Sequence, residues 1–252
     1  MKKCMAANWK MFKTAKEAAD TIQALQASIS SKLPSDREVV VFPPFTAIPA
    51  VSETLGDNPD IKLGGQNFYP ASEGAFTGEI SPGMLLDLNC DYALVGHSER
   101  RHIIKESGEI ISSKVDFGLQ SGLKIVLCIG ETLEERNQGK LQEVLQAQIS
   151  ALQDLSGNDI SNRLEIAYEP VWAIGTGEVA GPREIKDAHG LVRTLLQDAL
   201  PNEGGNIRIL YGGSVKPENT SEIISIDNVD GVLVGGASLD ADKFSQIVLA
   251  DK

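Results

Sequence analysis

The chain alternates between short apolar runs and longer segments in which apolar residues recur every three or four positions. Eight runs occur, and each is nearly continuous in apolar residues rather than alternating. Such runs are typical of parallel strands that are buried on both faces. They cover residues 4–8, 39–42, 61–65, 92–96, 124–130, 164–168, 207–211 and 231–236.

Helical patterns separate these runs. The stretch from Thr14 to Glu17 has the spacing of a capping box, and helical spacing of apolar residues predicts helices over 132–153 and 182–200 and shorter ones over 216–226 and 239–250. Eight strand–helix units in 252 residues predict an α/β fold of one domain, a (β/α)8 barrel over 1–252. A doubly wound sheet is the alternative, but its usual Gly-x-Gly-x-x-Gly does not follow the first run.

Composition excludes several classes of partner. The formal charge is −12, from 23 Lys and Arg against 35 Asp and Glu, which disfavours binding to nucleic acid or to an anionic membrane. Cys4, Cys90 and Cys128 form no Cys-x-x-Cys pair, so we expect neither a disulfide framework nor a cysteine zinc site. With no signal-like segment after Met1 and no apolar stretch of membrane-spanning length, we expect a soluble, cytoplasmic protein.

Polar and glycine-rich positions follow five of the predicted strands. Barrel enzymes carry their chemistry at the carboxyl ends of strands, so we expect these positions to share one rim of the barrel. They are Asn8 and Lys10 after the first run, His97 after the fourth, Glu169 after the sixth, and the glycine-rich turns 212–214 and 235–236 after the seventh and eighth.

The residue types at this rim suit proton transfer next to a carbonyl group in a small phosphorylated sugar. Glu169 would remove a proton from carbon, His97 would polarise the carbonyl oxygen, and Lys10 would stabilise the enediolate. His97 would begin a helix, whose partial positive charge favours the neutral ring. The glycine turns would bind phosphate through backbone N–H groups. No motif for a redox cofactor, a nucleotide or a metal occurs, so we expect a cofactor-free reaction without metal.

Residues 168–177, YEPVWAIGTG, attach a segment with two glycines directly after Glu169. An enediol phosphate loses phosphate readily in water, so we interpret this segment as a cover for the intermediate. His102 and His189 fall inside predicted helices, and we expect both to be structural or exposed.

Six motifs resemble the triosephosphate isomerase family, in the family's order: ANWKM (7–11), GAFTGEIS (74–81), VGHSERR (95–101), YEPVWAIGTG (168–177), YGGSV (211–215) and GVLVGGASL (231–239). The resemblance implies that Glu169 is the base, His97 the electrophile, and Lys10 and Asn8 substrate-binding residues. It also implies phosphate contacts from the backbone of Gly175, Ser214, Gly235 and Gly236, and supporting roles for Glu99 and Cys128.

The resemblance further implies a homodimer. Residues 66–80 form a long loop with several apolar side chains, which would insert beside the active site of a second subunit. Thr77 near the tip of this loop would support Asn8 and Lys10 across the interface. Two departures from the family's pattern are Phe12-Lys13 after the first motif and Glu178-Val179-Ala180 after the fourth. A sugar-phosphate-binding barrel without catalysis and a purely structural protein remain as alternatives.

Overall fold

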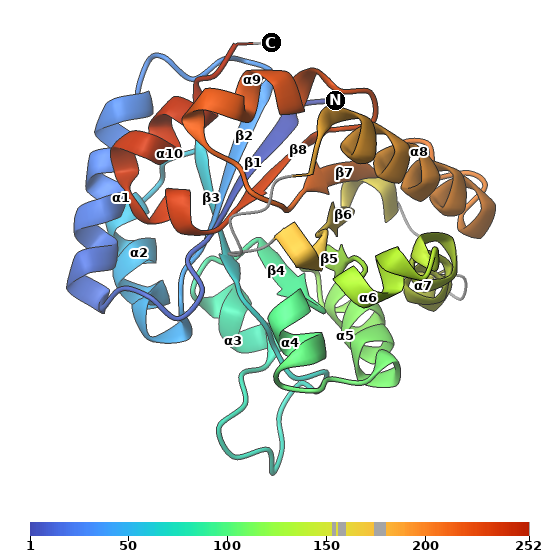
Figure 1. Cartoon of the computed structure of the whole chain (residues 1–252). Coiled ribbons are helices and arrows are strands. Elements are labelled where there is room, and N and C mark those ends of the chain that lie inside the picture. Colours follow the sequence, from blue (N-terminus) through green and yellow to red (C-terminus); the bar gives the residue numbers. More distant parts are fainter. Residues whose placement is uncertain (153–154, 156–159, 174–179, 252) are drawn as a thin grey trace.

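The computed structural model describes residues 1–152, 155, 160–173 and 180–251. Eight parallel strands follow one another in chain order, and β8 pairs with β1, so that the sheet closes into a barrel (Figure 1). Helices surround the strands (Figure 1). The prediction of a (β/α)8 barrel is therefore confirmed.

The strands agree with the eight predicted apolar runs to within two residues at each end. Both 61–65 and 164–168 match in full. The strands are β1 (Lys3–Asn8), β2 (Arg37–Phe42), β3 (Ile61–Gly65), β4 (Tyr92–Val95), β5 (Lys124–Ile129), β6 (Leu164–Tyr168), β7 (Arg208–Tyr211) and β8 (Gly231–Val234).

Several α-helices begin at a capping residue. Thr14 caps the first one in a capping box with Glu17, as predicted. The helices are α1 (Ala15–Ile29), α2 (Ile48–Leu55), α3 (Pro82–Asp87), α4 (Ser98–His102), α5 (Gly108–Gln120), α6 (Leu133–Asn137), α7 (Leu141–Ile149), α8 (Pro182–Ala199), α9 (Pro217–Ser225) and α10 (Ala241–Val248).

The predicted helical segment 132–153 is two helices, α6 and α7. Gly139 lies between them with a φ of 71°, in the left-handed region that ends a helix. Residues 134–140 contain no apolar side chain, so the helical apolar spacing is interrupted at the break and the prediction of one continuous helix was wrong.

Two apolar layers form the core. The larger lies between the barrel and its helices and includes Ile22 of α1 and Val192 of α8. The smaller fills the inside of the barrel and includes Val40, Leu94 and Leu210. Because side chains fill the interior, chemistry is confined to the two ends of the barrel.

The amino-terminal end of the barrel is closed by a cluster of ionised groups at the starts of strands. Arg208 places Nη2 2.7 Å from Oε2 of Glu38 and also pairs with the buried Glu165. The same guanidinium donates to the hydroxyl of Tyr92 at 3.2 Å. These contacts compensate the buried charge at this end.

The segment 66–80 leaves the barrel as a long protruding loop, drawn in teal in Figure 1. Its two sides are joined by a hydrogen bond of 2.8 Å from the N–H of Tyr69 to the carbonyl of Ile80. The rings of Tyr69 and Phe76 pack with their centroids 4.2 Å apart, and residues 72–79 are exposed. Within the part of the chain that the structure describes, no helix has both the length and the apolar character needed to cross a membrane.

Candidate active site

The side chains predicted at the strand ends do share one rim of the barrel. They line a cavity of about 700 Å³ together with the two glycine-rich turns. The predicted residues among its lining are Asn8, Lys10, His97, Glu169, Ser214, Gly235 and Gly236. The predicted cover is described only in part, because Val171–Ala173 form a short 3-10 helix whereas residues 174–179, Gly175 among them, lie outside the described residues.

Glu169 follows β6 directly and is buried, with 3% of its surface exposed. Its N–H donates to the carbonyl of Ile129 at 2.7 Å. Two neighbouring turns pass so close that only glycine fits: a Cβ on Gly130 would lie 1.7 Å from the carbonyl oxygen of Glu169, and one on Gly212 would lie 2.8 Å from its Cγ. The base predicted from the sequence is therefore held between β5 and β7.

The carboxylate of Glu169 points at the beginning of α4. Oε1 lies 3.0 Å from Nε2 of His97, and Oε2 accepts a hydrogen bond of 3.0 Å from the N–H of Ser98. Burial opposes ionisation of this carboxyl, but the nearby His97 lowers the pKa of Glu169 below its ordinary value. In this arrangement the carboxylate is stabilised, and hence a weaker base.

His97 is the N-cap of α4, as the sequence predicts. Its Nδ1 accepts a hydrogen bond of 3.2 Å from the N–H of Glu99, so the ring carries its proton on Nε2, facing Glu169. Burial opposes a charged ring, but the Glu169 carboxylate more than offsets burial and raises the pKa of His97. A second proton would have to bind Nδ1, which could then no longer accept the hydrogen bond from the N–H of Glu99.

Lys10 has an unusual backbone, with a φ of 52°. Its N–H donates to Oδ1 of Asn8 at 2.9 Å, and its carbonyl accepts from Nε2 of Gln66 at 2.8 Å. The ammonium lies 2.6 Å from Oε1 of Glu99, the residue for which the sequence predicts a supporting role. The sequence analysis did not single out Gln66. Gln66 directly follows β3, however, in the same way that Glu169 directly follows β6.

The glycine-rich turns form the wall of the cavity beside Lys10. An added Cβ on Gly235 would lie 3.4 Å from Cε of Lys10, so this turn is within reach of the lysine side chain. Gly236 begins the short 3-10 helix Gly236–Leu239, which is fastened by a hydrogen bond from the indole of Trp9 to the carbonyl of Ser238 at 3.0 Å.

Cys128 and Thr77 lie away from this wall. Cys128 is buried inside the barrel, and burial raises the pKa of its thiol well above the ordinary value. The Arg101 guanidinium donates to its carbonyl at 2.9 Å. Thr77 is exposed near the tip of the protruding loop. Phe12, one of the departures from the family's pattern, lines the cavity; of the second departure, Glu178 and Val179 lie outside the described residues.

Comparison with known proteins identifies the family of the chain. The family model described as triosephosphate isomerase matches residues 3–251. The chain belongs to the triosephosphate isomerase family. Proteins named triosephosphate isomerase are 59% identical in Nitratidesulfovibrio vulgaris strain Miyazaki F, over 99% of this chain and 100% of the relative, and 54% identical in Oleidesulfovibrio alaskensis, over the same shares.

A more distant triosephosphate isomerase, from Aquifex aeolicus, is 43% identical over 98% of this chain and 99% of its own length. The similarity therefore extends over the whole barrel rather than over the motifs alone. Triosephosphate isomerases interconvert dihydroxyacetone phosphate and D-glyceraldehyde 3-phosphate, a reaction of glycolysis and gluconeogenesis. Membership of the family assigns the chain this aldose–ketose isomerase activity.

Proposed function

We propose that the cavity at the carboxyl ends of the strands isomerises triose phosphates by proton transfer through an enediol(ate), with Glu169 as base. The observation that carries this proposal is the contact of 3.0 Å between the carboxylate of Glu169 and Nε2 of His97. The pair consists of a proton acceptor and a proton donor at one cavity that also holds a lysine.

Each group has a defined task in the proposed reaction. Glu169 removes a proton from the carbon next to the carbonyl group and returns it to the neighbouring carbon. Nε2–H of His97 donates to the substrate oxygens, and Lys10 stabilises the negative charge that develops on them. Asn8, whose Oδ1 accepts from the N–H of Lys10, keeps the lysine backbone in its strained conformation.

Substrate binding would change the base. A substrate seated between Glu169 and His97 separates the carboxylate from the ring that lowers its pKa. The desolvation caused by burial then dominates, and the pKa of Glu169 rises. The carboxylate becomes a stronger base only when a carbon acid is in place.

The phosphate group would bind at the opposite wall. Glycine-rich turns offer backbone N–H groups to an anion, and the ligands there would be the backbone of Ser214, Gly235 and Gly236. Gly175 of the segment after Glu169 completes this set in the prediction from the sequence.

We also propose a cytoplasmic homodimer. The loop 66–80 extends from the same side of the barrel as α3 and α4 (Figure 1). Large apolar side chains are exposed on the loop, on α3 and directly after α4, among them Phe76, Met84, Ile103 and Ile104. Burying them against a second copy removes apolar surface from water, and a two-fold axis lets each subunit give and receive a loop. The three cysteines are free, which suits a reducing compartment.

The test is a coupled assay of the conversion of dihydroxyacetone phosphate into glyceraldehyde 3-phosphate. We expect turnover by the natural chain and a loss on the order of 10²–10⁴-fold or more in kcat for Glu169→Gln. Glu222→Gln, on the exposed side of α9, is the matched control. A folded natural chain that binds the substrate without converting it would instead be a binding barrel, and kcat unchanged in Glu169→Gln would disprove the base.

A further inference from the structure

A buried carboxylate, Glu131, organises the chain that follows Glu169. It is fully buried and comes directly after β5 and Gly130. Its Oε1 accepts hydrogen bonds from the indole of Trp172 at 2.9 Å and from Nη1 of Arg136 at 2.9 Å. The hydroxyl of Tyr168 lies 3.0 Å from Oε2, and the backbone carbonyl of Glu131 accepts from the N–H of Val171 at 3.1 Å.

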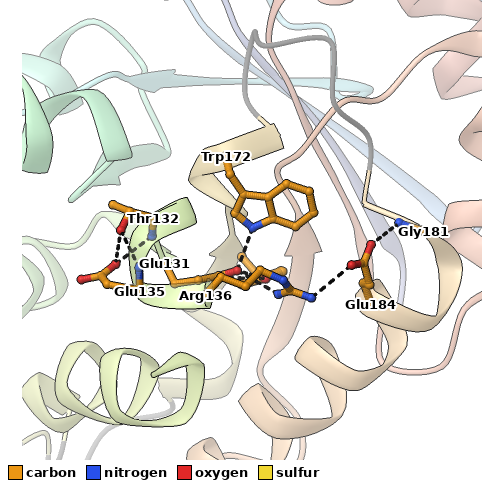
Figure 2. Close-up of polar contacts among 8 residues, drawn as sticks. Glu131, Thr132, Glu135, Arg136, Trp172, Gly181 and Glu184 are labelled. Carbon is orange, nitrogen blue, oxygen red and sulfur yellow. Dashed lines mark hydrogen bonds and ion pairs between the residues drawn. The ribbon is translucent and has the colours of Figure 1, made fainter. Parts of the chain in front are cut away.

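Arg136 reaches from this carboxylate to a second one. Its Nη2 lies 3.5 Å from Oε1 of Glu184 in the first turn of α8, and Oε2 of Glu184 accepts from the N–H of Gly181 at 2.8 Å. The guanidinium also lies over the ring of Trp172, with Cζ 5.0 Å from the centroid. Figure 2 shows Arg136 between the two carboxylates, with the indole of Trp172 beside it.

One guanidinium thus connects the two stretches that flank residues 174–179. Trp172 lies in the short 3-10 helix Val171–Ala173, three residues after Glu169, and Gly181 caps α8. The connections run from Gly181 through Glu184 to Arg136, and from Arg136 to Trp172 both directly and through Glu131. Helix α6, which carries Arg136, is itself fixed by a capping box.

We propose that Arg136 is a positioning residue for the isomerisation: it holds Trp172 and Gly181 in a fixed relation to each other and so keeps Glu169 in place. This inference rests on the proposed role of Glu169. Arg136 lies outside the residues that line the cavity in the described part of the chain, so its effect passes through the residues it contacts.

The geometry requires arginine rather than a positive charge alone. A planar guanidinium binds two carboxylates with different nitrogens while its face lies on an aromatic ring. The ammonium of a lysine has no such face and offers one compact group for both carboxylates. Removal of the group also leaves the buried Glu131 without its cation, although Tyr168 and Trp172 still donate to it.

The effect on Glu169 follows from its neighbours. The turn at Gly130 and Glu131 contacts the backbone of Glu169 and holds Val171 by a main-chain hydrogen bond. If Trp172 loses its cation, the stretch after Glu169 loses one of its attachments. A small displacement of a catalytic group reduces rate by as much as about 100-fold, so kcat should fall by about 10- to 100-fold.

The experiment compares Arg136→Met and Arg136→Lys with the matched control Arg183→Met, an exposed arginine of α8 that is one residue from Glu184. Four quantities are measured on the full chain: kcat, KM, the fraction of enediol phosphate lost to elimination, and Trp fluorescence. Elimination breaks the carbon–oxygen bond to phosphate and yields methylglyoxal and inorganic phosphate. Circular dichroism and Tm identify variants that fail to fold.

We expect both Arg136 variants to lower kcat more than they raise KM, to increase the eliminated fraction and to shift Trp emission to longer wavelength, with Arg136→Met more affected. Glu184→Gln keeps an oxygen for the N–H of Gly181 but removes the charge opposite Arg136. Its effect should therefore be largely absent when Arg136 is already Met.

Several results would overturn the inference. Folded Arg136→Met with the same kcat and eliminated fraction as Arg183→Met would make the network purely structural, and full activity in Arg136→Lys would show that charge alone suffices. Additive effects of Glu184→Gln and Arg136→Met on kcat would show that Arg136 does not act on Gly181 through Glu184. Absence of isomerase activity in the natural chain would refute the proposed function instead, and Trp emission would still report whether Arg136 holds Trp172.

Discussion

Nε2 of His97 lies 3.0 Å from Oε1 of Glu169, and 7% and 4% of these two side chains are exposed. Each group changes the other's affinity for protons: the ring lowers the pKa of the carboxyl, and the carboxylate raises the pKa of the ring. The protonation of the two groups is therefore coupled before any substrate arrives, and the coupling can be broken by changing either partner.

Replacing the ring should move the acid limb of the pH profile. Glu169 acts as a base only when ionised, so kcat/KM of the free enzyme falls as pH drops through the pKa of its carboxyl. His97 lowers that pKa, and in His97→Asn burial raises it without this opposition. We expect the acid limb of the variant at higher pH, with kcat reduced on the order of 10²–10⁴-fold. If the acid limb of His97→Asn lay at the same pH as that of the natural chain, the two groups would not be coupled.

Replacing the lysine should weaken binding and turnover together. Lys10→Met removes the cation that faces both the phosphate wall and the developing enediolate, and hydrogen bonds to charged groups contribute about 1.5–3 kcal/mol. Steady-state kinetics should show a KM at least about tenfold higher and a lower kcat. Lys16→Met removes an exposed lysine of α1 and should change neither parameter. If Lys10→Met also left both unchanged, Lys10 would be an ordinary surface lysine.

A charge at the loop tip should separate the proposed dimer. Thr77→Arg places a guanidinium where the loop would enter the neighbouring subunit, and burying it unpaired is unfavourable. Sedimentation should show folded monomers with severely reduced kcat. Gln197→Arg, on the exposed side of α8, controls for the added charge. Sedimentation of the fully active natural chain as a monomer at micromolar concentration would disprove the dimer.

A buried histidine should make the fold sensitive to acid. Burial lowers the pKa of His189 to about 4, from 6.5 in an unfolded chain, while Nδ1–H of its ring donates a hydrogen bond of 2.9 Å to the carbonyl of Asn228. Because the unfolded state binds this proton first, the stability present above pH 6.5 is lost as pH falls from 6.5 to about 4, by about 3 kcal/mol.

His189→Gln should flatten this part of the curve of unfolding free energy against pH, even if the variant is less stable at pH 8. Denaturant titrations across this range measure the slope directly. If the slope of unfolding free energy against pH were the same in His189→Gln as in the natural chain, the acid sensitivity would come from other groups.

The sequence predicts what depends on neighbours along the chain. Each apolar run marks a strand, and a polar residue at the end of a run marks the rim, so Glu169 and His97 could be placed together without coordinates. Glu131 has the same signal, an acid directly after a strand and a glycine, but it joins residues more than 40 positions away through Trp172 and Glu184.

Relations of that kind depend on how the barrel closes and on which side chains reach across it. The support of Lys10 by Gln66 is a further case, because it spans 56 residues. The break between α6 and α7 is a different case, because the interval 134–140 without apolar residues and Gly139 within it do mark the break in the sequence. What the sequence leaves out is therefore mainly the set of residues that hold the reacting groups in place.

The charged cluster at the amino-terminal end of the barrel has a consequence for protein engineering. Glu165 and Arg208 of this cluster lie at the starts of β6 and β7, whose other ends lead to Glu169 and to the glycine-rich turn 212–214, with a layer of apolar side chains between. Optimising a catalyst commonly trades robustness for speed because the same residues serve both. Here the two demands fall on opposite ends of the barrel. Variants of this cluster that are selected for thermal stability should therefore keep the turnover of the natural chain. Such a stabilised variant can then serve as the starting point for directed evolution at the rim.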